Sequence, residues 1–214
     1  MRTVRILEML NAGKLDELKA ELRDEIYKES LKNKPNAKKR YAAMKKYFSY
    51  HKTSRECLQK PCKVIFEDKE YTSFTNSWSL VLTTEDTGEL ELFDKSEGNY
   101  PDVTKLINFD GIKRKVDFNK IFAEADSRGY RLTKSEVGHK FKYLMKYDRT
   151  YYKVGLLDMS YGLINDGKEA MVYHPDGERM PLTIKNDIGI CVIMPVYFHD
   201  GDVDETKEVI EVEL

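Results

Sequence analysis

The first fifty residues place apolar side chains at three- and four-residue steps, which is the spacing of amphipathic helices. The pattern predicts helix over residues 3 to 31, with Gly13 separating a short first helix from a longer second one. The periodic apolar positions of the longer helix are Leu15, Leu18, Leu22 and Ile26. Pro35 then opens a further helix over about residues 36 to 50. The N-terminal part of the chain is therefore expected to be helical.

From residue 62 onward the pattern changes to short β-rich runs separated by polar turns, which predicts strands. The expected strands cover residues 62–68, 69–75, 78–85, 89–93, 140–147, 170–174, 180–184 and 189–198. Two helices interrupt them: one follows an N-cap at Asp117, and one spans about residues 153 to 164. A helix followed by strands, twice over, predicts an α+β fold with helices on one side of mainly antiparallel sheets.

The chain contains no Gly/Ser-rich linker or low-complexity segment, so we expect one principal domain. This α+β domain is assigned to residues 35–198. An N-terminal helical extension precedes it at residues 1–34, and an acidic C-terminal tail follows at residues 199–214.

Composition narrows the class of protein. Hydrophobic residues make up 41% of the chain and charged residues 34%, as in globular proteins with a strongly solvated surface. No run of about 18 apolar residues is present, and charges near the N-terminus argue against a signal peptide. Cys57, Cys62 and Cys191 form no Cys-x-x-Cys pair. They favour a reduced, cytoplasmic protein with buried thiols.

The net charge of −1 conceals a basic segment in an otherwise acidic chain. Residues 32 to 63 hold eleven lysines and arginines and a single acid, Glu56, so this segment carries +10 and the remainder sums to −11. Such a block favours contact with a polyanion, although a solvated lysine-rich helix face is the other interpretation. The candidate cations lie opposite and beside the apolar stripe of the 36–50 helix: Lys38, Lys39, Lys45, Lys46 and Lys52.

The sequence holds no recognisable catalytic constellation. Glycine-rich phosphate loops, nucleophile elbows and His-Glu-x-x-His motifs are all missing from it. The scattered histidines are expected at the surface or in turns: His51, His139, His174 and His199. We therefore expect no enzyme, no cofactor and no metal site.

Three motifs, taken in order, resemble the bacterial DNA polymerase sliding clamp (β clamp) family. Residues 75 to 80, TNSWSL, are similar to the family's Thr-Asp-Gly-His-Arg-Leu signature. Residues 98 to 107, GNYPDVTKLI, look like its Phe/Tyr-Pro-Asp-Tyr-Arg-Arg-Val-Leu segment, and residues 189 to 196, GICVIMPV, resemble its closing strand. The resemblance covers roughly residues 36 to 198.

The resemblance implies a DNA-clamp-like domain of repeated helix-plus-strands halves, which surrounds duplex DNA and contacts phosphates without reading sequence. It makes the five lysines named above candidate DNA-binding residues. It also implies a pocket for short peptides of replication proteins, carried over to Thr75, Trp78, Leu80, Met194, Pro195 and Val196. Trp78 is then either a wall of this pocket or an apolar cap beside a hairpin turn.

Bacterial clamps carry several such domains per chain, and this chain has room for about one, so a ring would need a homo-oligomer of about six copies. The divergent motifs favour a phage or mobile-element origin. The first hypothesis is a non-enzymatic, clamp-like protein associated with DNA or the replication machinery. The alternatives are a clamp-fold interaction module or regulator that does not bind DNA, and a phage-encoded enzyme of unrecognised type.

Overall fold

A computed structural model describes residues 2–34, 36–50, 55–96, 98–128, 143–147, 150–177, 179–196 and 208–211. Its α-helices are α1 (Arg2–Asn11), α2 (Leu15–Ser30), α3 (Ala37–Tyr50), α4 (Phe118–Ser127) and α5 (Val154–Tyr161). Short 3₁₀ segments lie at Glu56–Leu58 and Val103–Leu106. Each α-helix lies where the sequence pattern predicted one, and the Asp117 carboxylate caps α4 by accepting a hydrogen bond from the Asn119 N–H. Among the described residues, no helix is both long enough and apolar enough to cross a membrane.

The main sheet is antiparallel throughout, with the strand order β1-β2-β3-β9-β8-β7-β4. Its strands are β1 (Cys62–Phe66), β2 (Lys69–Thr75), β3 (Ser79–Thr83), β4 (Ile112–Val116), β7 (Ala170–His174), β8 (Leu182–Lys185) and β9 (Gly189–Ile193). A second sheet has the order β10-β5-β6. It consists of β5 (Tyr143–Tyr147), β6 (Thr150–Lys153) and β10 (Glu208–Glu211), which runs parallel to β5. The predicted α+β class with mainly antiparallel sheets is confirmed.

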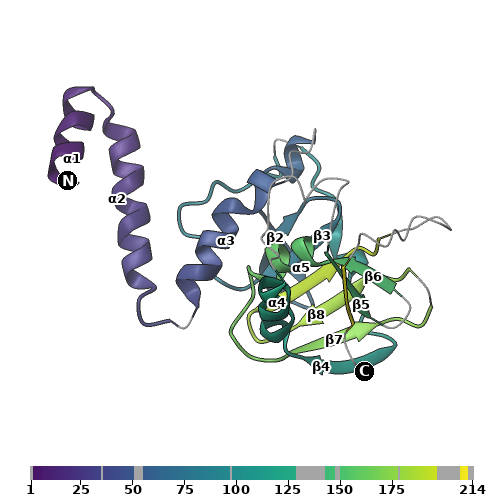
Figure 1. Cartoon of the computed structure of the whole chain (residues 1–214). Helices are drawn as coiled ribbons and strands as arrows, with labels where there is room; N and C mark the ends of the chain where they lie inside the picture. The colour runs from purple at the N-terminus through teal and green to yellow at the C-terminus, as the bar shows by residue number, and fades with distance from the viewer. Residues whose placement is uncertain are drawn as a thin grey trace.

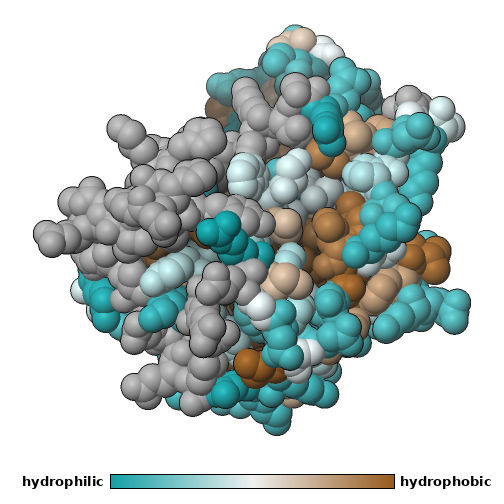
Figure 2. Space-filling model, turned by 90° about the vertical axis from the view of Figure 1, so that its right-hand side faces the viewer, coloured by the Kyte–Doolittle hydropathy of each residue, from teal (hydrophilic) through white to brown (hydrophobic). Residues whose placement is uncertain are grey.

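Helices and an irregular connector cover opposite faces of the main sheet. Helices α3, α4 and α5 lie together on one face (Figure 1), where they share the larger hydrophobic core. The smaller core lies on the other face. There Val103, Ile107 and Phe109 of the connector, the segment between β3 and β4, pack on strand residues such as Leu80. Helix α5 is so central that seven of its eight residues are buried, and the exception is Asp158. Seen from the side in Figure 2, the described surface is mostly hydrophilic with one gathering of apolar side chains.

Two hairpin turns of the main sheet are built alike. Between β2 and β3, the Asn76 Oδ1 atom accepts hydrogen bonds from the backbone N–H groups of Trp78 (3.0 Å) and Ser79 (2.9 Å). Between β8 and β9, Asn186 Oδ1 accepts the two equivalent hydrogen bonds, each 3.0 Å long. Strands β3 and β9, which follow these turns, pair with each other in the middle of the sheet. Two similar hairpins therefore meet at the centre of the domain.

Helices α1 and α2 form a hairpin that stands to one side of the sheet and its helices (Figure 1). Its buried side chains are Met9 and Leu18. Tyr27 ties α2 to the domain, because its hydroxyl donates to the Asp86 carbonyl (2.6 Å) and its ring meets the ring of Tyr41 edge-on, with 4.7 Å between centroids. Large apolar side chains of the hairpin are exposed: Val4, Leu7, Leu10, Leu15 and Ile26.

Two expectations are wrong. Residues 89–93 form no strand, because β3 is already paired on both sides by β2 and β9 and leaves no ladder for the segment that follows it. His174 lies fully buried on β7, with its ring 5.5 Å from that of Tyr147, and not at the surface or in a turn. Strands β4, β6 and β10 were not predicted; β10 lies in the segment expected only as an acidic tail. The other three histidines lie outside the described residues.

Candidate functional site

The exposed side of α3 is rich in lysine. Its four exposed cations, called the lysine face below, are Lys38, Lys39, Lys45 and Lys46. The buried side of the same helix carries Ala37, Tyr41, Met44 and Tyr47. Residues seven apart fall on one side of a helix, which is why the two pairs of lysines stack above each other. Lys52, the fifth candidate, lies outside the described residues.

One flank of the lysine face is held by an acid of α2. The Asp24 carboxylate accepts hydrogen bonds from Lys45 Nζ (3.0 Å) and the Tyr41 hydroxyl (2.8 Å), and it pairs with Lys28 Nζ at 2.7 Å. Burial raises the pKa of Asp24, but the hydrogen bonds from Lys28, Lys45 and Tyr41 outweigh it and bring the pKa down to about 2. Asp24 therefore stays ionised and partly neutralises the positive charge of Lys45.

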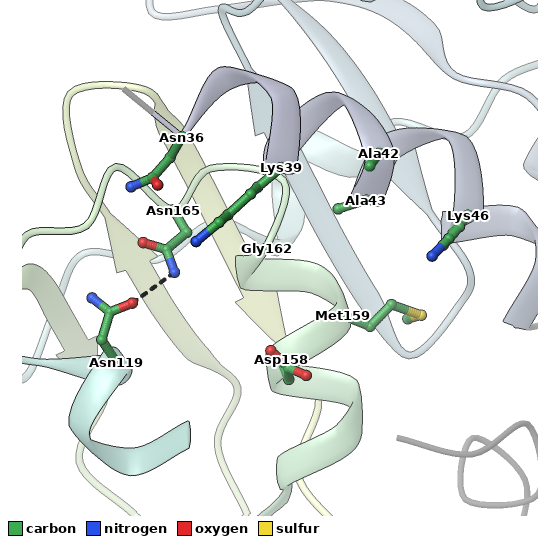
Figure 3. Close-up of a pocket in the computed structure, with 10 residues that line it drawn as sticks. All are labelled: Asn36, Lys39, Ala42, Ala43, Lys46, Asn119, Asp158, Met159, Gly162 and Asn165. Carbon is green, nitrogen blue, oxygen red and sulfur yellow. Dashed lines mark hydrogen bonds between the residues drawn. The ribbon is translucent and has the colours of Figure 1, made fainter. Parts of the chain in front are cut away.

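The other flank borders a pocket between α3 and α5 of about 420 Å³, called the α3–α5 pocket below (Figure 3). Lys39 and Lys46 line it, and Ala42, Ala43 and Gly162 leave room because their side chains are small or missing. Its remaining lining residues are Asn36, Asn119, Asp158, Met159 and Asn165. Within the described part of the chain, Lys39 forms no ion pair. Its ammonium group is available to a ligand.

Amide groups gather at the Lys39 end of the pocket. Asn165 Nδ2 donates to Asn119 Oδ1 (3.0 Å), and Asn165 Oδ1 accepts from the Gly167 N–H (2.8 Å). Figure 3 shows the Lys39 side chain extending from α3 toward these two asparagines. An ammonium beside side-chain amides offers several hydrogen-bond donors to an anionic oxygen.

Asp158 brings a carboxyl group into the same pocket from α5 (Figure 3). In the described part of the chain its carboxylate has no hydrogen-bond or ion-pair partner. Burial raises the pKa of Asp158, and the charge of Asp126 on α4 raises it further, to about 6. The pocket thus joins two lysines with an acid that changes charge near neutral pH.

Arg40, also on α3, does not belong to the lysine face. Its side chain is buried, and its guanidinium pairs with Glu85 (2.9 Å) and donates to the Asn165 carbonyl (3.1 Å). These contacts hold α3 against two loops of the domain. Arg40 therefore positions the lysine face without being exposed itself.

The residues predicted to bind a peptide fall into two groups. Thr75, Leu80 and Pro195 are buried, whereas Trp78 is 41% exposed at the β2–β3 turn. The Trp78 carbonyl accepts a hydrogen bond from the Met194 N–H (2.9 Å), so the two sequence motifs do meet inside one domain. Met194 and Val196 are half-buried. The Lys153 ammonium lies 5.4 Å from the centre of the Trp78 ring, which adds a cation to this surface.

The sequence alone did not reveal the pocket residues outside α3. Asp158 lies in a helix whose other residues are buried, and no pattern of neighbouring polar residues marked it as part of a site. Asn119 and Asn165 are 46 positions apart and meet only in the fold. The one available signal was a lone carboxylate within the apolar run of α5, Gly155 to Met159. A single charge in a buried helix is uncommon unless it has a role.

The fold and this pocket define an α+β protein with a lysine-bordered pocket in its helical layer. No protein-family model matches the sequence, and no curated protein matches it. Among solved structures, the chain is similar to the DNA polymerase sliding clamp from Bacillus subtilis, with a TM-score of 0.47 and 15% sequence identity. The alignment covers 77% of this chain and 63% of the clamp chain, so this chain spans less than two thirds of the clamp's length.

Proposed function

We propose that the protein is a non-enzymatic, DNA-associated protein whose lysine face binds the phosphates of duplex DNA without reading base sequence. The observation that supports this most directly is that two exposed lysines, Lys39 and Lys46, line the same open pocket, while the other side of α3 is buried. Ammonium groups on long side chains contact phosphates as point charges, and such contacts hold DNA without fixing its register.

The charge of the segment agrees with this proposal. Residues 32 to 63 carry +10, and on α3 four of these cations lie on one exposed face. The amides of Asn119 and Asn165 beside Lys39 add uncharged groups of the kind that also contact phosphate and sugar oxygens. The proposed site therefore combines a local field with short-range hydrogen bonding.

The proposal assigns DNA contact to residues 35–198, with residues 1–34 as a helical extension and residues 199–214 as an acidic tail. A homo-oligomer of about six copies would close a ring around the duplex. The resemblance of three sequence motifs to the sliding-clamp family implies the same kind of sequence-independent contact.

The test is an equilibrium titration of a labelled duplex of about 30 base pairs with wild-type protein and with the Lys39→Glu/Lys46→Glu variant. The matched control is Lys113→Glu/Lys115→Glu, two exposed lysines of β4. Because Val116 packs in the helix-side core and side chains alternate along a strand, Lys113 and Lys115 point to the opposite face of the sheet.

We expect the α3 variant to bind DNA at least about tenfold more weakly and the β4 variant to bind close to the wild type. Equal losses in both variants would contradict the assignment to α3. No binding by the wild type would instead favour the interaction module that does not bind DNA.

A second candidate function is peptide binding at Trp78. Its support is the exposed indole ring beside Met194, with Lys153 above it. An apolar surface with one cation suits a short peptide that carries an apolar side chain and an acid. Trp78 is the single tryptophan of the chain, so its fluorescence reports binding directly. A saturable change that Met194→Ala weakens supports this function, and an unchanged spectrum contradicts it.

A further inference from the structure

The α3–α5 pocket has one feature that phosphate binding alone does not explain. Asp158 enters from α5 between groups that would attract an anion, and its ionised carboxylate would repel one. Asp158 is half-buried, and polar groups withdrawn from water are normally paired. In the described residues, the Asp158 carboxylate has neither a hydrogen-bond donor nor a cation within bonding distance.

We propose that Asp158 makes phosphate binding in the α3–α5 pocket depend on pH, with the pocket accepting a phosphate best when the Asp158 carboxyl is protonated. This inference rests on the proposed function, because it concerns the same lysine face. A protonated carboxyl is neutral and can donate a hydrogen bond to a phosphate oxygen. The ionised form offers only acceptors and a negative charge. Both effects act in the same direction.

Among the residues that the structure describes, few charged groups lie around Asp158. From α4, Asp126 disfavours ionisation of Asp158. From α3, Lys39 and Lys46 line the same pocket but neither forms an ion pair with it within 4.0 Å. The other lining residues do not titrate near neutral pH. The strands that pack on α5 meet its buried side, where Val154 and Leu157 lie in the hydrophobic core.

These surroundings place the change of charge in a useful range. The pKa of Asp158 is raised to about 6, first by burial and then by Asp126. Above this pH the carboxylate opposes an incoming phosphate, and below it the opposition disappears. Because dissolved salt screens the repulsion between the carboxylate and the phosphate, the pH dependence of binding should be strongest at low ionic strength.

The experiment measures the dissociation constant for a duplex of about 30 base pairs at pH 5.5 and pH 7.5, at equal ionic strength and with a dye whose emission does not change over this range. Wild type is compared with Asp158→Asn. The matched control is Asp110→Asn, which removes an exposed acid on the connector. Unfolding curves at both pH values show that each variant is folded.

We expect wild type to bind at least about threefold more tightly at pH 5.5 than at pH 7.5. Asp158→Asn should bind at both pH values as wild type does at pH 5.5, and Asp110→Asn should keep the wild-type ratio. The same pH ratio in wild type and in Asp158→Asn overturns this inference and leaves the proposed function standing. No binding by any variant at either pH refutes the proposed function and this inference together.

A second readout uses the carboxyl group itself. Phosphate binding and protonation of Asp158 are linked, so DNA that prefers the protonated form must raise the pKa of Asp158 by the same factor. The carboxyl carbon of Asp158, followed by NMR with and without saturating duplex, should titrate at higher pH in the complex. An unchanged or lowered midpoint contradicts the inference.

Discussion

The carboxylate of Asp24 on α2 and the ammonium of Lys45 on α3 form an ion pair, with 3.0 Å between Oδ1 and Nζ. This contact distinguishes two parts of the lysine face. The part with Lys45 is partly neutralised by an acid of the α1–α2 hairpin, whereas Lys39 and Lys46 border the α3–α5 pocket. We assign the main role in phosphate contact to Lys39 and Lys46 because both line this pocket together with the amides of Asn119 and Asn165.

The Asp24 cluster predicts a pH-dependent contribution to stability. The pKa of Asp24 is about 2 in the folded protein, below its ordinary value of 3.8, so folding favours the ionised form. Its stabilising contribution is present above about pH 4 and is lost as the pH falls toward 2. Asp24→Asn should lower the free energy of unfolding at pH 7, and the difference from wild type should shrink below pH 4.

The control for this prediction is Asp16→Asn, which removes an exposed acid of α2 paired with Lys19 at 3.6 Å. Exposed pairs of this kind contribute little to stability. Urea unfolding between pH 7 and pH 2.5 measures both variants. An Asp24→Asn curve that runs parallel to wild type over the whole range would show that the cluster adds no pH-dependent stability.

Asp158 predicts the opposite dependence. Its pKa is raised from 3.8 to about 6, so folding favours the protonated carboxyl, and the advantage is lost as the pH rises from about 4 through 6. Asp158→Asn should therefore stabilise the protein by about 2 kcal/mol at pH 8 and by almost nothing at pH 4. Equilibrium unfolding at the two pH values tests this. A variant that is less stable than wild type at pH 8 would show that the half-buried Asp158 carboxylate does not destabilise the fold.

The sequence predicted burial correctly where apolar residues recur at helical spacing. The predicted stripe of Ala37, Tyr41, Met44 and Phe48 marked the inner side of α3, and with it the exposed positions of Lys39 and Lys46. Phe48 is only half-buried, and the fully buried Tyr47 was not predicted. Spacing of this kind depends only on neighbours along one helix. It can therefore be recognised without knowledge of the fold.

The rest of the pocket depends on tertiary contacts that no local pattern records. Asn119 and Asn165 meet across 46 positions, and Asp158 lies in a helix that is buried almost all round, so α5 shows no polar side in its sequence. Strand β4 escaped prediction because its sequence, Ile-Lys-Arg-Lys-Val, is dominated by charge. It is an edge strand, where lysines are common.

The central pair of strands makes a prediction about Gly189. A Cβ atom at this position would lie 2.0 Å from the carbonyl oxygen of Leu82 on β3, and backbone cannot give way as a flexible side chain can. Gly189→Ala should therefore separate β9 from β3 locally and cost about 3 kcal/mol of stability. Gly98→Ala is the control, because its Cβ would meet nothing closer than 3.5 Å, at Phe93. Equal melting temperatures of the two variants would contradict the close approach of β3 and β9.

The central claim is that Lys39 and Lys46 touch DNA phosphates, and the salt dependence of binding tests it most directly. Each phosphate contact releases condensed counterions and contributes about −0.9 to the slope of log K against log salt concentration. We expect Lys39→Gln/Lys46→Gln to reduce the size of the wild-type slope by about 2, whatever the duplex sequence. A variant that binds more weakly but keeps the wild-type slope would show that these lysines do not contact phosphates.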